Sequence, residues 1–567
     1  MVYNECTPIK MTFVFEFGFP FKHRCPPDTP STFRKQTPFF QARRAQPLRS
    51  LFILLCSLMK LLASLALIFA TLSLVASAPS PITLRQNDRV VIVGGGPAGV
   101  HYASLLVKKG LKKVVLLEAL DRVGGKSRTE IDRDGIPHEL GTCFLNGVYG
   151  PIFDLLNEYD PTNEKFVWAL NAPNYVKVLG ESIGVADSDP VSNLDYPRYL
   201  IRSIALNAPP ELQRNANVTE LQDLVRFQIG RYIALHYAIF GKYSYGLPPP
   251  PKAWSLIDMT AMEFLKRNNL TALEGTLRFS QQQQGYGVLE TIPAFYMLWW
   301  MHPDQFLKKT NVYSLRKGFQ SLWTAVHAAH KNQYKTIFLA RATSVSRGNK
   351  WNKPRVTYQT KWGDLDTIEA DHVVMAVDLS LYAGLVEDLS AEEKQLFQGG
   401  DYTASAFLST LYESDASPIE TASVGWFGRM QENGRVSALR NSKLSYLFTN
   451  STDWGDLAKG RQTNLAYQYY SHPLDKVNST ASKAQLDADL KLAGIKNVEV
   501  ATQLHTNYFP RFTPAGLKKG LLWKIWDIQG QRKTTWIGSS VSFESVLDVV
   551  VYNNNLIQYV NVTVPRY

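Results

Sequence analysis

Three glycines with fixed spacing are the residues of this chain whose type points most directly to chemistry. Gly94, Gly96 and Gly99 follow the apolar run Val-Val-Ile-Val and fit the pattern Gly-x-Gly-x-x-Gly. Without a Cβ, they allow a tight turn, close approach of a pyrophosphate to the backbone, and close packing of a helix on a strand. A helix N-terminus then offers free N–H groups and partial positive charge to the phosphates. The pattern predicts dinucleotide binding at Gly94, Gly96, Pro97, Ala98 and Gly99.

The flanking segments supply the strand–helix–strand context that such a turn needs, and an ordinary structural turn is the alternative interpretation. Residues 100–109 are helix-like, Gly110 is a stop signal, and residues 114–117 form a second apolar strand. Glu118 ends that strand roughly 20 residues after the last glycine, where an acidic side chain binds ribose hydroxyls. The predicted cofactor contacts at this point are Glu118 and Ala119.

A second glycine pair, directly after the acidic residue, indicates which dinucleotide is bound. Residues 122–129 read Arg-Val-Gly-Gly-Lys-Ser-Arg-Thr. This run resembles the Arg-x-Gly-Gly-Arg-x-x-Ser/Thr element of the FAD-binding amine oxidase and phytoene desaturase superfamily. The resemblance implies that Gly124, Gly125 and Lys126 lie along the pyrophosphate and ribityl chain of FAD. Lys126 stands where arginine is usual, so the positive charge is kept and the bidentate fork is lost.

The next segment is similar to the part of these proteins that passes close to the isoalloxazine ring. Residues 138–142 read His-Glu-Leu-Gly-Thr. The resemblance implies FAD contacts from Leu140, Gly141 and Thr142.

The C-terminal part resembles the same superfamily. Residues 534–538, Thr-Thr-Trp-Ile-Gly, read as a strand that ends in glycine, and small and apolar residues follow at 539–551. The resemblance implies FAD contacts from Gly538, Ser539 and Val546, with Ser539 in place of the usual glutamate. Three such motifs, in order and at both ends of the chain, imply FAD as the cofactor.

One branch of the superfamily is more similar than the rest. Tyr-Phe-Pro at 508–510, Gly-Tyr-Gly at 285–287 and Gln-Gly-Gln-Arg-Lys-Thr at 529–534 resemble the bacterial FAD-dependent polyunsaturated fatty acid (linoleate) isomerases. The resemblance implies that a hydride leaves an allylic carbon and returns at another carbon, so that a double bond moves without net oxidation. The arginine that binds the substrate carboxylate in those enzymes has no counterpart within residues 166–174.

The predicted function is therefore a secreted FAD-dependent oxidoreductase that acts on a small, unsaturated and lipophilic substrate, with fatty acid isomerisation as its specific form. Alternatives are an amine or amino-acid oxidase that uses O2, a dehydrogenase or cyclase of secondary metabolism, and a binding protein that keeps FAD as structure. The sequence identifies no catalytic residue. His101, His138 and His505 are expected to be structural. The aromatic run 292–301 is expected to be a buried helix whose inner face can line an apolar pocket.

Composition excludes several other classes of function. The chain has 567 residues, 45% hydrophobic and 19% charged, which is typical of a globular protein with a sizeable core. Its net charge of +12 is spread without a basic run, so nucleic acid binding is not predicted. His and Cys do not fall at the spacings of metal ligands.

A segment near the N-terminus has the features of a secretory signal peptide. Met59-Lys60 begins it, residues 61–75 are apolar, and Ala76-Ser77-Ala78 fits a cleavage site. Residues 59–78 are the predicted signal peptide, and residues 1–58 are interpreted as an upstream extension that is non-native or disordered. A membrane anchor over residues 51–78 is the alternative; cleavage would leave no membrane span.

After cleavage Cys143 would be the sole cysteine of the chain, and no intrachain disulfide could form. Five sequons follow the signal, which predicts a glycoprotein: Asn217, Asn269, Asn450, Asn478 and Asn561.

The expected fold is α/β. A Rossmann-like, doubly wound FAD-binding domain of the amine oxidase type is expected from residues 85–180, 313–380 and 505–567. A discontinuous α+β substrate domain is expected from residues 181–312 and 381–504. The active site should lie where the two domains meet.

Overall fold

The computed structural model describes residues 79–172, 175–179, 194–213, 217–308, 311–348, 352–448 and 454–564. The predicted signal peptide, the preceding residues 1–58 and the sequon at Asn450 lie outside these ranges. Among the described residues, no helix is both long enough and apolar enough to cross a bilayer.

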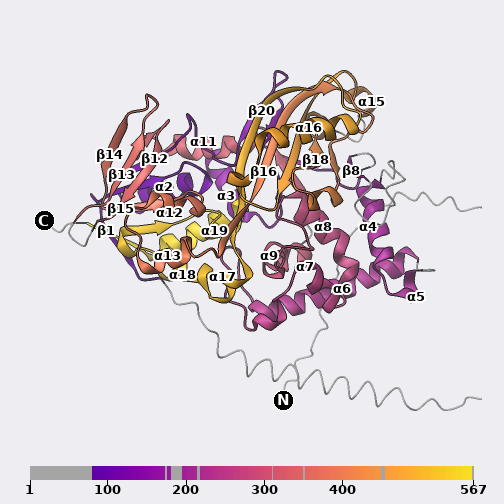
Figure 1. Cartoon of the computed structure of the whole chain (residues 1–567), viewed down its shortest axis with the longest axis horizontal. Helices are drawn as coiled ribbons and strands as arrows, with labels where there is room; N and C mark the ends of the chain where they lie inside the picture. The colour runs from indigo at the N-terminus through magenta and orange to yellow at the C-terminus, as the bar shows by residue number, and fades with distance from the viewer. Residues whose placement is uncertain are drawn as a thin grey trace, which may run out of the picture. The chain divides into compact units, whose positions relative to one another are not determined.

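A parallel sheet of five strands forms the frame for the glycine turn, as the sequence predicted (Figure 1). Its strands, in spatial order, are β11 (Lys335–Ile337), β3 (Lys113–Leu117), β2 (Arg89–Val93), β15 (His372–Met375) and β21 (Thr534–Trp536). The last four residues of β2 and of β3 are buried. Continuous apolar runs of this kind are typical of parallel strands that are covered on both faces.

Helices from distant parts of the chain pack beside this sheet. α2 (Pro97–Lys108) follows β2 directly and contacts α11 (Phe319–His330) and α19 (Val546–Leu556). α3 (Gly150–Tyr159) contacts the last two as well. Helices from early and late in the described residues thus meet around α2.

Smaller sheets complete this part of the molecule. An antiparallel sheet is formed by β12 (Arg341–Ser346), β13 (Arg355–Gln359) and β14 (Leu365–Glu369). Two-stranded pairings join β1 (Ile82–Arg85) to β22 (Val560–Thr563) and β4 (Thr129–Ile131) to β5 (Pro137–Glu139), and β10 (Val312–Leu315) pairs with β6 (Leu145–Asn146) and β7 (Lys165–Val167).

A seven-stranded sheet forms the second large layer (Figure 1). In spatial order it contains β20 (Glu499–Phe512), β16 (Tyr402–Asp415), β19 (Arg461–Tyr470), β18 (Val436–Arg440), β17 (Ser423–Gly425), β8 (Val176–Val178) and β9 (Leu194–Asp195). Its pairings are antiparallel except for β17 with β8. β20 passes through residue 505, where the sequence analysis placed a domain boundary.

Between β9 and β10 in the chain, the described residues are mainly helical. The helices include α4 (Tyr196–Leu206), α6 (Val218–Phe240), α7 (Ala261–Arg267), α8 (Glu274–Gln283) and α9 (Ala294–Trp300) (Figure 1). α6 begins at a capping box in which the Glu220 N–H donates to the Asn217 side chain and the Asn217 N–H donates to the Glu220 carboxylate. All seven residues of α9 are buried, as expected for the aromatic run. The mixed helix and strand composition agrees with the predicted α/β class.

Candidate functional site

The first glycine turn is shaped by close contacts that exclude side chains. Gly94 has a φ of +109°, in the region that favours glycine. A Cβ on Gly99 would lie 1.9 Å from the carbonyl oxygen of Gly94, so the helix could not pack against the turn. α2 begins after Gly96 with no side-chain cap and no acidic residue in its first turn. Its first N–H groups are therefore open to an anion.

The acidic residue and the second glycine turn lie beside the first turn. Glu118 accepts hydrogen bonds from the N–H groups of Gly95 at 2.7 Å and Leu120 at 2.8 Å. The N–H of Gly124 donates to the carbonyl of Gly95 at 2.9 Å. A Cβ on Gly125 would approach the Cα of Gly96 to 2.9 Å, so these two backbones lie in direct contact.

The C-terminal motif reaches the same place from the last strand of the parallel sheet. Gly538 follows β21, and a Cβ there would meet the Cβ of Ala98 at 3.5 Å. The Lys126 ammonium donates to the hydroxyl of Ser539 at 3.2 Å and forms an ion pair with Glu544. Burial raises the pKa of the Glu544 carboxyl, and the Lys126 charge acts in the opposite direction.

A cavity continues from Lys126 along the segment that was predicted to face the isoalloxazine. Its lining includes Gly141, Thr142, Glu544 and Val546, so predicted residues from both ends of the chain face one space. Leu140 does not line this cavity; its side chain packs in a cluster with Leu411, Leu465 and Tyr467. The N-terminus of α2 has open N–H groups, the glycine turns leave their backbone accessible, and Glu118 places a carboxylate at the end of β3. Together these features fit a dinucleotide.

Two more cavities adjoin the first one. A chamber of about 220 Å³ shares Phe144, Tyr149 and Gln284 with it. A smaller cavity of about 20 Å³ shares Gly141, Cys143, Gln284 and Tyr508 with it. The apolar and aromatic residues of the chamber are Phe144, Leu145, Tyr149, Trp168, Leu170, Val176, Tyr196, Phe279, Trp300, Met301, Phe306 and Val312.

A run of four glutamines lies where the three cavities adjoin. The side-chain amides of Gln281, Gln282 and Gln283 donate to the Tyr286 carbonyl, the Phe427 carbonyl and the Ser423 hydroxyl. Gln284 faces all three cavities. Beyond a polar run next to an aromatic segment, no pattern in the sequence indicates this role, because tertiary structure brings Phe427 and Ser423 to the glutamines.

The titratable groups around the cavities are strongly buried. Burial raises the pKa of the Glu139 carboxyl to about 8, against the opposing effects of the Phe319 N–H, the Thr129 hydroxyl and the Arg440 charge. Burial also raises the pKa of the Cys143 thiol, which lines the two smaller cavities. Neither group is poised as an ionised nucleophile at neutral pH.

The histidines singled out in the sequence lie away from these cavities. His101 is buried in α2, and burial lowers its pKa to about 3. His138 contacts Asp132 at 2.9 Å, and burial lowers the pKa of His505. Across the described ranges no group of His, Cys, Asp and Glu is arranged to hold a metal ion.

Fold and site together define a dinucleotide-binding α/β enzyme with a second, apolar chamber. Residues 97–453 match the sequence model of the flavin containing amine oxidoreductase family. The chain belongs to this family. It is an FAD-dependent enzyme, and FAD is its cofactor.

Curated relatives are similar at low identity. The chain is 26% identical over 303 residues to an L-amino-acid oxidase of Crotalus adamanteus, covering 51% of this chain and 50% of that protein. It is 24% identical over 286 residues to the polyenoic fatty acid isomerase of Ptilota filicina, covering 47% of this chain and 52% of that protein. The chain thus spans about half the length of the curated relatives it matches.

Solved structures share the fold over most of the chain. A fatty acid isomerase from P. acnes that produces CLA aligns with a TM-score of 0.59 and 19% identity, covering 84% of this chain and 99% of that one. Putrescine oxidase bound to putrescine aligns with a TM-score of 0.55 and 16% identity, covering 84% and 99%. These similarities confirm the fold predicted from the sequence motifs.

Proposed function

We propose that this enzyme transfers a hydride between an unsaturated, lipophilic substrate and atom N5 of FAD, and that it moves a double bond of a polyunsaturated fatty acid. The residues predicted from the sequence, from Gly94 to Val546, hold the cofactor in this proposal. The two structural domains are proposed to follow the predicted division, with the substrate at their junction.

The observation that carries the proposal is the apolar chamber of about 220 Å³ beside the predicted isoalloxazine segment. Trp168, Phe279 and Trp300 are among its walls, and it shares Phe144 with the cavity at Lys126. Apolar walls exclude water from the reacting carbon. Ring faces stabilise the positive charge that develops on an allylic carbon as a hydride leaves.

The proposed reaction balances without a further reagent. Bound FAD supplies the hydride acceptor. In the substrate an allylic C–H bond breaks and the hydride leaves with both electrons. When the hydride returns to a different carbon of the same allylic system, a C–H bond forms there and the double bond has moved without net oxidation.

An oxygen-dependent amine or amino-acid oxidase is the second candidate, and the similarity to L-amino-acid oxidases favours it. Recognition of a substrate ammonium needs a carboxylate or an aromatic cage. Of the described residues that line the three cavities, the one carboxylate is Glu544, and Lys126 pairs with it. Because Lys126 neutralises this carboxylate, an ammonium would depend on the aromatic rings of the chamber, whereas a lipophilic chain would use its whole apolar lining.

The test is anaerobic titration of the FAD-loaded enzyme with linoleate, with putrescine and leucine as parallel ligands. The proposal expects a conjugated-diene product and no lasting bleaching of the flavin absorbance. Lasting bleaching that O2 reverses would identify a net oxidase or dehydrogenase of lipids and refute isomerisation. Bleaching and peroxide release with an amine or amino acid alone would refute the lipophilic substrate.

Secretion is part of the proposal and has its own test. The chain is expressed with residues 59–78 in a eukaryotic host, and the secreted protein is sequenced from its N-terminus. Cleavage after Ala78 predicts a mature chain that begins at Pro79. Retention of residues 59–78 in a membrane fraction would favour the anchor.

A further inference from the structure

Arg440 is a buried arginine without a carboxylate partner among the described residues. It is the last residue of β18, and its side chain is 4% exposed. Its Nη1 atom donates to the hydroxyl of Tyr467 at 3.2 Å. Its Nε atom is buried and has no hydrogen-bond partner. The Cys143 thiol lies beside the guanidinium.

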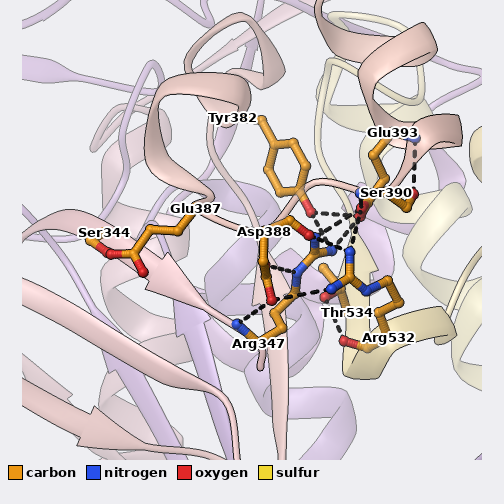
Figure 2. Close-up of polar contacts among 9 residues, drawn as sticks. All are labelled: Ser344, Arg347, Tyr382, Glu387, Asp388, Ser390, Glu393, Arg532 and Thr534. Atoms are coloured by element: carbon orange, nitrogen blue, oxygen red, sulfur yellow. Dashed lines mark hydrogen bonds and ion pairs between the residues drawn. The ribbon is translucent and has the colours of Figure 1, made fainter. Parts of the chain in front are cut away.

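Two other arginines with buried guanidinium groups are neutralised by carboxylates. Figure 2 shows Arg347, whose guanidinium forms ion pairs with Glu393 and, at 3.0 Å, with Asp388. Arg278 is held in the same way by Glu274 and Glu290. These pairs show how this fold compensates a buried guanidinium when the charge serves structure.

Aromatic rings, rather than carboxylates, surround the Arg440 guanidinium among the described residues. The guanidinium carbon lies 4.4 Å from the ring centre of Phe144, 5.1 Å from that of Tyr467 and 5.6 Å from that of Trp168. Glu139 is close enough to interact electrostatically with the guanidinium, but burial raises the pKa of the Glu139 carboxyl to about 8. Its ionised form is thus disfavoured at neutral pH.

Arginine does not lose its proton in proteins, so Arg440 stays charged although it is buried. An uncompensated buried charge costs several kcal/mol, so a fold keeps one where something else supplies the counter-charge. Arg440 lines the cavity of about 20 Å³, which has room for one ordered water or a carboxylate oxygen. An anionic group of a ligand in this cavity would lie against the charged guanidinium.

We propose that Arg440 binds the carboxylate of the substrate, and that the rest of the substrate lies in the apolar chamber. The small cavity and the chamber share Gln283 and Gln284 in their linings, so the two spaces adjoin, and the proposal places the head group at Arg440 and the chain in the chamber. Phe144 and Trp168 contact the guanidinium and also line the chamber. The inference rests on the proposed function and adds the residue that binds the carboxylate of its fatty acid substrate.

The test compares a saturated acid with its neutral alcohol, because neither can be isomerised. Binding of octanoate and of 1-octanol to the full-length, FAD-loaded enzyme is measured by calorimetry in the wild type, Arg440→Gln and Arg440→Lys. The wild type should bind octanoate more tightly than the alcohol. Arg440→Gln should weaken octanoate roughly 10- to 100-fold, as for loss of a charged hydrogen bond, and change the alcohol less than about 3-fold. Arg440→Lys should recover part of the preference.

Arg316 offers a matched control outside the cavities. Its guanidinium also stacks on two rings, Phe166 at 4.7 Å and Tyr446 at 4.5 Å, and donates to the Tyr446 carbonyl at 2.8 Å. Arg316→Gln should leave the ratio of octanoate to octanol affinity at its wild-type value. FAD content and thermal midpoint are recorded for each variant, so that a folding defect is seen separately.

Two results would overturn the assignment. If Arg440→Gln weakens the binding of octanoate and of octanol equally, the arginine is a purely structural cation that stacks on rings. Unchanged octanoate affinity would place the carboxylate elsewhere. The parallel linoleate turnover assay separates this inference from the proposed function. Arg440-dependent octanoate binding without linoleate isomerisation refutes the function alone, whereas isomerisation without such dependence refutes the inference alone.

Discussion

The substitution Gly96→Ala should separate binding of the cofactor from folding of the protein. A Cβ on Gly96 would have the Cα of Gly125 as its nearest heavy atom, at 3.8 Å, which is an ordinary contact. The backbone at Gly96 has φ −71° and ψ −177°, which alanine adopts without strain. Alanine here should thus change the free energy of unfolding of the apoprotein by less than about 1 kcal/mol, because the lower entropy of the unfolded chain offsets the poorer N-cap preference of alanine.

The same methyl group would occupy the space between the two glycine turns that the pyrophosphate approaches. Loss of one charge-assisted hydrogen bond to the α2 N-terminus costs about 1.5–3 kcal/mol, which raises the Kd for FAD roughly 10- to 100-fold. FAD at 100 times the wild-type Kd stabilises the wild type by about 2.7 kcal/mol, and stabilises a variant with 100-fold weaker binding by about 0.4 kcal/mol. Urea unfolding with and without FAD measures both quantities.

Two other glycines calibrate the result. Gly99→Ala should destabilise even the apoprotein, because its Cβ would lie 1.9 Å from the Gly94 carbonyl oxygen. Gly230→Ala lies within α6 in open space and should raise stability by about 0.5–1 kcal/mol without changing the FAD affinity. Wild-type FAD affinity in Gly96→Ala would refute the proposed path of the cofactor between the two turns.

Three further outcomes follow from the buried polar groups. Arg347→Met should lower the free energy of unfolding by about 3–5 kcal/mol in urea titrations, because Glu393 and Asp388 lose their counter-charge. Wild-type stability should fall as pH rises from 5 to 8, because the folded Glu139 carboxyl has a raised pKa of about 8 and unfolding lets it ionise; Glu139→Gln should flatten that profile. Gln284→Ala should raise the KM for chamber ligands about 2- to 10-fold at constant FAD content, since a cavity-facing amide is lost.

The cofactor half of the site could be predicted from the sequence because it depends on backbone. Gly94, Gly99 and Gly124 occupy positions where a Cβ would collide or where φ is positive. Such positions require glycine, so they can be recognised from the residue type alone. Their spacing also sets the turn between β2 and α2. A short linear motif therefore carries most of the geometry of this region.

The substrate half could not be predicted in the same way because its residues are ordinary ones brought together by tertiary structure. Gln284 follows α8, Arg440 ends β18, and Trp168 follows β7. An arginine at the end of a strand looks like a surface residue in sequence. Its burial under Phe144, and the absence of a carboxylate partner among the described residues, result from the tertiary structure and leave no local pattern in the sequence.

Under the proposal, this difference explains why the carboxylate-binding arginine of the similar isomerases lacks a counterpart in residues 166–174 while Arg440 takes its role. Residues 166–174 contain no arginine, yet Trp168 from that stretch contacts the guanidinium of Arg440. A carboxylate site requires a cation at a point in space, and any strand that reaches the point can supply it. If the backbone motifs determine where FAD lies, as proposed, a substrate anchor can come from any of the elements around it. Comparison of acid and alcohol binding in Arg440→Gln therefore tests the position of the charge itself.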